Sequence, residues 1–172
     1  MIPNFQSNGI LPSGIHWSTI EEVKDKLCFS DKRVELILGL EQAILSLKIA
    51  GCKTIYLDGS FATSKEIPGD IDVCWEVDGV DLDMLIKIEP VLWEFDSGRK
   101  SQKDKFGCEF FPTFFIAEPP DKTFINFFQQ DRDGKPKGII GLIIWVMIKN
   151  DKQYGVTKSN LKKFQDAIKV IS

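Results

Sequence analysis

The sequence has few of the residues that mark a disulfide framework, a zinc site or a membrane anchor. Its four cysteines lie singly, without paired spacing, which argues against a zinc site and against disulfide staples. The longest apolar run covers residues 138–148 and is short of the roughly 20 residues that cross a bilayer. The first residues carry neither a basic start nor an apolar signal core. We therefore expect a soluble, cytoplasmic protein that makes no membrane contact.

Basic charge and histidine are also scarce. A net charge of −3 argues against a protein that coats itself with nucleic acid, although it leaves room for a local basic patch. The only histidine, His16, lies beside Trp17, where we expect packing or capping rather than catalysis. With 172 residues the chain is long enough for one domain with its own core.

The remaining pattern predicts alternating helices and strands. We expect an irregular arm to about residue 17, a helix begun by the capping box Ser18–Glu21, and a helix over residues 31–51. Further along we expect strands at 54–57, 71–77 and 108–117, helices at 81–88 and 123–130, and loops at 98–105 and 131–138. Pro112 places the 108–117 strand at a sheet edge or bends it. The run after Gly138 fits a buried strand or a helix. This order predicts an α+β fold with a small mixed β-sheet flanked by helices.

Two regions follow from this pattern. Residues 1–147 are expected to form the principal domain and residues 148–172 a C-terminal helical extension. The extension carries an apolar stripe that lies opposite several lysines. The stripe consists of Leu161, Phe164, Ile168 and Ile171. It fits a packed terminal helix, a dimerisation or partner-binding helix, or an RNA contact.

The residues that carry chemistry lie between the end of the first predicted strand and the start of the second. Asp70 and Asp72 are two apart on a strand, so both carboxylates project to the same side. Two like charges at this spacing favour a divalent cation, and hard oxygen ligands suit Mg²⁺ or Mn²⁺. Gly59 lets the backbone approach a ligand at the exit of a strand, and Ser60 adds a hydroxyl. A phosphate-binding turn beside a metal-binding acid pair predicts phosphoryl or nucleotidyl transfer.

This arrangement resembles the polymerase-β-like nucleotidyltransferase superfamily, in which Gly-Ser follows an apolar strand and Asp-x-Asp lies on the next. In particular the chain resembles small stand-alone bacterial members, some of which belong to toxin–antitoxin or phage-defence operons. The stretches 11–17, 56–61, 107–112 and 136–139 resemble one uncharacterised subfamily of these proteins. The resemblance extends to about residue 145. It implies a nucleotidyltransferase-like fold with Mg²⁺ (or Mn²⁺) and a nucleoside triphosphate as ligands.

The resemblance also implies a third carboxylate on a later strand, which aligns or deprotonates the attacking hydroxyl. Glu109, Glu118 and Asp104 are the candidates. We choose Glu109 because it opens the next predicted strand, where a neighbouring register would bring it beside Asp70 and Asp72. Lys65 and Lys137 are candidate phosphate partners by charge and position. The implied catalytic set is therefore Asp70, Asp72 and Glu109, with the two aspartates as metal ligands.

The implied function is transfer of a nucleoside monophosphate from the triphosphate to an RNA or protein hydroxyl. As a toxin–antitoxin or defence component, the chain would bind a cognate antitoxin or self-associate through its C-terminal helix. One alternative is a catalytically inactive module of the same fold that binds a nucleotide or a partner protein. Another is a nucleic-acid-binding protein acting through the tail lysines, which the scattered placement of basic residues disfavours.

Overall fold

Five strands form one mixed sheet in the computed structural model, which describes residues 1–144. Across the sheet the order is β1 (Gly14–Ser18), β7 (Gly138–Ile143), β2 (Thr54–Asp58), β3 (Ile71–Trp75) and β4 (Cys108–Pro112). β1 is parallel to β7 and β3 is parallel to β4, whereas β2 is antiparallel to both of its neighbours. Two short strands, β5 (Ile116–Glu118) and β6 (Lys122–Thr123), pair separately. The predicted α+β class is confirmed.

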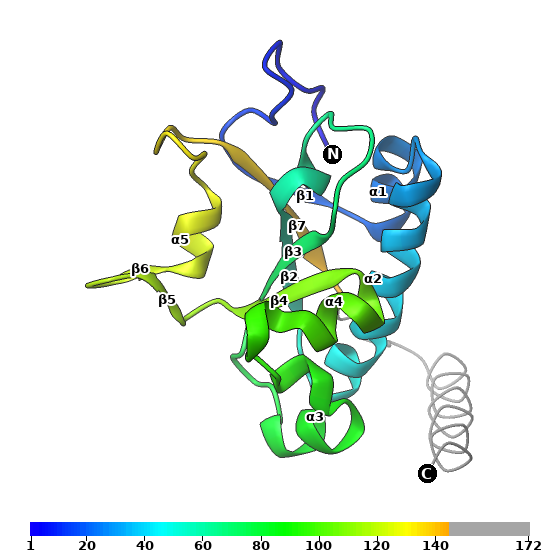
Figure 1. The fold of residues 1–172 in the computed structure, drawn as a ribbon, viewed down its shortest axis with the longest axis vertical. Coiled ribbons are helices and arrows are strands. Elements are labelled where there is room, and N and C mark those ends of the chain that lie inside the picture. The colour runs from blue at the N-terminus through cyan, green and yellow to red at the C-terminus, as the bar shows by residue number, and fades with distance from the viewer. Residues whose placement is uncertain (145–172) are drawn as a thin grey trace, which may run out of the picture.

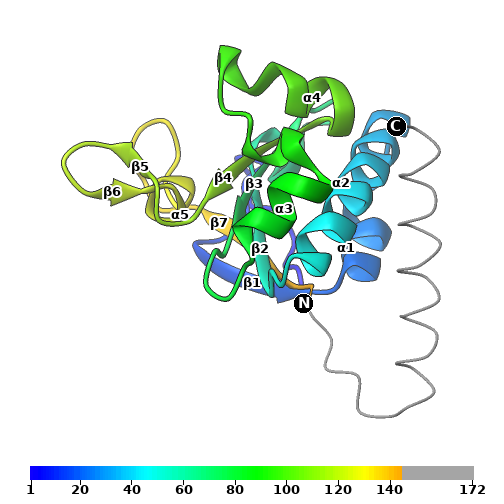
Figure 2. The ribbon, with the colours of Figure 1, turned by 90° about the horizontal axis from the view of Figure 1, so that it is seen from below.

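Helices cover one face of the sheet. They are α1 (Ile20–Leu27), α2 (Asp31–Ile49), α3 (Leu82–Ile88) and α4 (Lys100–Phe106), all on one side in Figures 1 and 2. The short helix α5 (Phe124–Phe128) lies on the other side with β5 and β6. None of the helices within residues 1–144 has the length and apolar character that a membrane span requires.

Alternation along the strands separates the two faces. In β3, Ile71, Val73 and Trp75 are fully buried in the main core against the helices. The intervening Asp72 and Cys74 therefore point to the opposite face. β2, β4 and β7 bury their core-facing side chains by the same alternation. The polar residues at the ends of β2, β3 and β4 consequently gather on the face away from α1 and α2.

The expected irregular arm is wrong over its last residues, which form β1. Gly14–Ser18 pairs with Gly138–Leu142 of β7 in a parallel register. The turn residues at Asn8-Gly9 and Pro12-Ser13-Gly14 predict an arm. The local sequence does not reveal the strand, because its partner β7 lies more than a hundred residues away. The same pairing shows that the run after Gly138 is a strand.

The expected loop at 98–105 is also wrong, because most of it is α4. The segment is polar, yet Gln102 and Phe106 are buried at helical spacing on the side facing the core. Lys100 and Asp104 form an ion pair one turn apart on the exposed side. A narrow apolar stripe is enough for a short helix when neighbouring elements bury it.

The start of the first helix lies one residue later than the predicted capping box. The cap is Thr19, whose hydroxyl accepts from the Glu22 backbone N–H at 3.2 Å. Ser18 instead donates to the Glu22 carboxylate at 2.7 Å. The predicted strand over 108–117 is wrong in its second half: β4 is an edge strand that ends at Pro112, and Ile116–Glu118 forms β5 of the separate two-stranded sheet. The remaining predicted helices and strands agree with the structure to within a few residues at their ends. The predicted C-terminal extension, 148–172, lies outside the described residues.

Candidate active site

The Gly59-Ser60 turn begins where β2 ends. Gly59 has φ +69°, in the left-handed region that glycine adopts without strain. A Cβ at this position would lie 1.9 Å from Oδ2 of Asp72, so a side chain here would displace that carboxylate. The close approach of the turn to Asp72 therefore requires glycine.

Three carboxylates form a row across adjacent strands. Asp58 at the end of β2 is opposite Asp72 of β3, and Asp72 is in register with Glu109 of the parallel strand β4. The predicted neighbour relation between Glu109 and Asp72 is confirmed by this register. Asp70 precedes β3 by one residue and adds a fourth carboxylate at the same edge. We call Asp58, Asp70, Asp72 and Glu109 the carboxylate cluster.

Burial and mutual repulsion change the acidity of this cluster. The pKa of Asp72 is raised to about 7, first by desolvation and then by the negative charges of Asp58, Asp70 and Glu109. Desolvation, followed by the Glu109 charge, also raises the pKa of Asp70. The site therefore holds more negative charge than it can stabilise alone, which favours a bound cation.

Two lysines neutralise the outer members of the cluster. Lys137 donates to Oδ1 of Asp58, and the side chains of this ion pair are 14% and 6% exposed. Lys103 donates to Oε1 of Glu109 at 2.8 Å. Lys137, which the sequence assigns to phosphate, therefore serves Asp58 as a counter-ion. Within residues 1–144 neither Asp70 nor Asp72 forms an ion pair, so these two carboxylates are left for a ligand.

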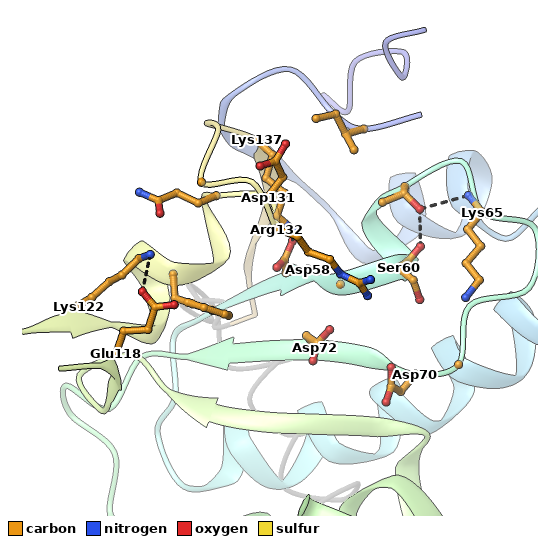
Figure 3. A pocket seen from close by; sticks show the side chains of 17 residues that line it. Asp58, Ser60, Lys65, Asp70, Asp72, Glu118, Lys122, Asp131, Arg132 and Lys137 are labelled. Carbon is orange, nitrogen blue, oxygen red and sulfur yellow. Dashed lines mark hydrogen bonds and ion pairs between the residues drawn. The ribbon is translucent and has the colours of Figure 1, made fainter. Parts of the chain in front are cut away.

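A cavity of about 990 Å³ opens over the cluster (Figure 3). Gly59, Ser60, Lys65, Asp70 and Asp72 line one wall, together with Asp58 and Lys137. The opposite wall comes from the segment between β5 and β7, including Phe127, Gln130 and Arg132. The cavity therefore joins six of the seven residues that the sequence assigns to the site. Glu109 is the exception, since it lies beside Asp72 but does not line the cavity.

A buried arginine holds the loop that follows the turn. Arg33 of α2 is fully buried and donates hydrogen bonds of 2.6–3.0 Å to the carbonyls of Phe61, Thr63 and Lys65. The Thr63 hydroxyl donates to the carbonyl of Ser60 at 2.7 Å. These contacts fix residues 60–65 against α2 and leave the exposed Lys65 side chain along the cavity wall (Figure 3).

Sequence reasoning missed Asp58, Arg33 and Arg132. The alternation of β2 offers a signal for Asp58, because a strand ending in Asp-Gly-Ser projects that carboxylate beside the turn. The roles of Arg33 and Arg132 depend on contacts between distant segments, for which the sequence carries no local signal.

The donor set suits a metal that is shared with a substrate. Within the described residues 1–144, no group of three His, Cys, Asp or Glu side chains is placed to hold a metal ion alone. Asp70 and Asp72 supply hard oxygens on the cavity wall. Mg²⁺ typically binds one or two carboxylates and completes its shell with substrate phosphates and water. The site therefore fits such an ion, and residues 1–144 offer it no complete protein cage.

Comparisons with known proteins define the family but not its activity. No curated protein and no solved structure matches the chain. The model of a family of unknown function, DUF6932, matches residues 3–143, which cover most of the sequence and every residue of the carboxylate cluster. The chain therefore belongs to the family of unknown function DUF6932.

Proposed function

We propose that this protein is a Mg²⁺-dependent nucleotidyltransferase with a nucleotidyltransferase-like fold. One observation carries the proposal: the Gly59-Ser60 turn contacts Asp72 and lines a single cavity with Asp70 and Asp72. Phosphoryl-group chemistry depends mainly on positioning and charge neutralisation, and this cavity combines a glycine turn, a hydroxyl and two carboxylates without partners in residues 1–144.

Each residue has a role that follows from its place. Asp70 and Asp72 would hold the divalent ion, which would supply charge neutralisation of the triphosphate. Ser60 and the turn backbone would bind the terminal phosphates, and Lys65 lies on the same wall. Arg33 acts indirectly, because it holds the loop carbonyls on the side away from the cavity.

The proposed reaction is displacement at the α-phosphorus. The oxygen of an acceptor hydroxyl forms a bond to the α-phosphorus, the bond to the bridging oxygen breaks, and pyrophosphate leaves with that electron pair. The hydroxyl proton passes to Glu109, the carboxylate of β4 that is in register with Asp72. The acceptor class is an RNA or protein hydroxyl. A toxin–antitoxin or defence role is part of the same proposal, carried by the sequence resemblance alone.

A specific feature favours a second candidate, a catalytically silent nucleotide-binding module. Glu109 is held by Lys103 at 2.8 Å and does not line the cavity. A third carboxylate fixed in this way would be less able to activate an acceptor. The silent module predicts nucleotide binding at the same wall with no turnover.

Label transfer distinguishes these two candidates. The purified chain is incubated with Mg²⁺, each of the four nucleoside triphosphates labelled at the α-phosphorus, and total RNA or protein. Transferase activity predicts that the acceptor becomes labelled and that pyrophosphate is released. In a parallel reaction with label at the γ-phosphorus, the acceptor should stay unlabelled. Asp70→Asn with Asp72→Asn should abolish transfer, and Asp83→Asn, an exposed carboxylate in the first turn of α3, should not. Transfer that survives the double substitution would overturn the site assignment.

A further inference from the structure

The positive charges around the cavity are unequally engaged. Four cationic side chains from the described part of the chain line it: Lys65, Lys122, Arg132 and Lys137. Lys137 is paired with Asp58, and Lys122 is paired with Glu118 at 2.9 Å. Within residues 1–144, Lys65 and Arg132 form no ion pair with a carboxylate. The cavity therefore contains two cations whose charge is available to an anionic ligand.

These two cations come from opposite walls. Lys65 follows the Gly59-Ser60 turn, whereas Arg132 belongs to the loop between α5 and β7. Figure 3 shows the Arg132 side chain extending from that loop into the cavity, toward Ser60. An anion bound at the turn would consequently have positive charge on both sides.

Hydrogen bonds within the Arg132 loop hold its backbone in place. The Asp131 carboxylate accepts from the backbone N–H groups of Asp133 and Lys135 at 2.9 and 2.8 Å. The Asp131 N–H donates to the Lys135 carbonyl at 2.8 Å, and Gln130 forms a bridge with Pro136. Asp131 is thus engaged with its own loop, which leaves the adjacent Arg132 guanidinium without that carboxylate as a partner.

Arginine at this place suits a phosphate chain better than a single small anion. A triphosphate carries more negative charge than one divalent cation neutralises, and the remainder needs fixed positive groups. A guanidinium presents a planar fork that donates two hydrogen bonds to phosphate oxygens. Lys137 cannot supply this charge without leaving Asp58 unpaired.

We propose that Arg132 binds the triphosphate from the wall opposite the Gly59-Ser60 turn, so that Lys65 and Arg132 clamp the phosphate chain from two sides. This inference rests on the proposed function. It adds a substrate-binding residue from a loop that lies about 60 residues after the Asp70–Asp72 pair. It also assigns the loop over residues 131–137 a role in retaining the substrate.

The test uses magnesium tripolyphosphate, because this probe contains the phosphate chain without any base. Calorimetry compares the wild type with Arg132→Ala, Arg132→Lys and the control Lys135→Ala, an exposed lysine of the same loop that does not line the cavity. Loss of charged hydrogen bonds predicts about 10- to 100-fold weaker binding for Arg132→Ala. Arg132→Lys should lie between, and Lys135→Ala should bind within about 2-fold of the wild type. Circular dichroism verifies that each variant is folded.

The outcomes separate this inference from the proposed function. Equal affinity of Arg132→Ala and the wild type would overturn the inference, while loss of magnesium-dependent binding in Asp72→Asn would leave the proposed function standing. A wild type that binds neither tripolyphosphate nor any of the four nucleoside triphosphates would overturn both. If Arg132→Ala keeps its affinity for tripolyphosphate and loses affinity only for RNA, the residue serves the acceptor and this inference is wrong.

Discussion

Gly59, the residue that follows β2, lies so close to Asp72 of the adjacent antiparallel strand β3 that a methyl group on Gly59 would fall 1.9 Å from the Asp72 carboxylate oxygen. This contact joins the proposed phosphate turn to the proposed metal ligands. Because Gly59 also has φ +69°, two independent constraints require glycine.

Gly59→Ala should therefore weaken both the fold and nucleotide binding. We expect a loss of about 1–3 kcal/mol in the free energy of unfolding, from the left-handed backbone and the displaced carboxylate. Chemical denaturation measures the first effect and calorimetry with Mg²⁺ and nucleoside triphosphate the second. Gly69→Ala is the matched control, since Gly69 lines the same cavity and a Cβ there meets no atom within 4 Å. Equal behaviour of the two variants would contradict the proposed contact.

Asp72→Asn should stabilise the metal-free protein at alkaline pH. The pKa of Asp72 is raised to about 7 in the folded chain, against about 3.9 in an unfolded one. The folded state therefore binds the extra proton between these values, and the wild type loses stability as pH rises through that window. We expect Asp72→Asn to gain on the order of 2 kcal/mol over the wild type at pH 8 and much less at pH 5.

Urea unfolding at both pH values, without divalent cations, measures this difference. Added Mg²⁺ with nucleotide should stabilise the wild type and leave Asp72→Asn unchanged. A variant that is less stable than the wild type at pH 8 without metal would show that the Asp72 charge is already compensated.

Lys137→Met should destabilise the protein by leaving Asp58 buried without its counter-ion. Removing one partner of a buried ion pair costs about 3–5 kcal/mol. The loss should be smaller at pH 5 than at pH 8, because Asp58 can then take up a proton. Adding Asp58→Asn should restore part of the stability, and Lys135→Met should have little effect. If Lys137→Met left stability intact and removed only nucleotide affinity, Lys137 would be a phosphate ligand instead.

Arg33→Met should release the loop over residues 61–65. The side chain donates five hydrogen bonds from a fully buried position, so we expect a loss of about 3 kcal/mol in unfolding free energy. Hydrogen exchange should become faster at the amides of residues 61–65 under native conditions. Lys32→Met, on the preceding residue, is the control. Unchanged exchange in Arg33→Met would remove its proposed role in holding the loop.

The core of the site could be predicted from short-range patterns. Alternation places Asp70 and Asp72 on one side of β3, and the glycine turn follows directly from the end of β2. Glu109 was predictable because it opens the next strand, and the parallel register with Asp72 confirms that neighbourhood. These relations depend on residues within one strand or on consecutive strands.

The remaining features depend on contacts that no local pattern encodes. β1 is a strand because it pairs with β7, and α4 is a helix because Gln102 and Phe106 are buried by other elements. Asp58 meets Lys137 across 79 positions of sequence. From charge and position alone, Lys137 was predicted to bind phosphate. Its pairing with the buried Asp58 depends on β2 lying next to β7, which the local sequence does not reveal.

The central claim is that Asp70 and Asp72 share one divalent cation with a triphosphate bound at Gly59 and Ser60. Crystals grown with Mn²⁺ and a non-hydrolysable nucleoside triphosphate test it directly, because the anomalous signal locates the metal. We predict a manganese peak bonded to oxygens of Asp70 and Asp72 and to the phosphates, with Ser60 and Arg132 contacting the same phosphate chain. A manganese ion bound elsewhere, or a nucleotide outside this cavity, would contradict the account.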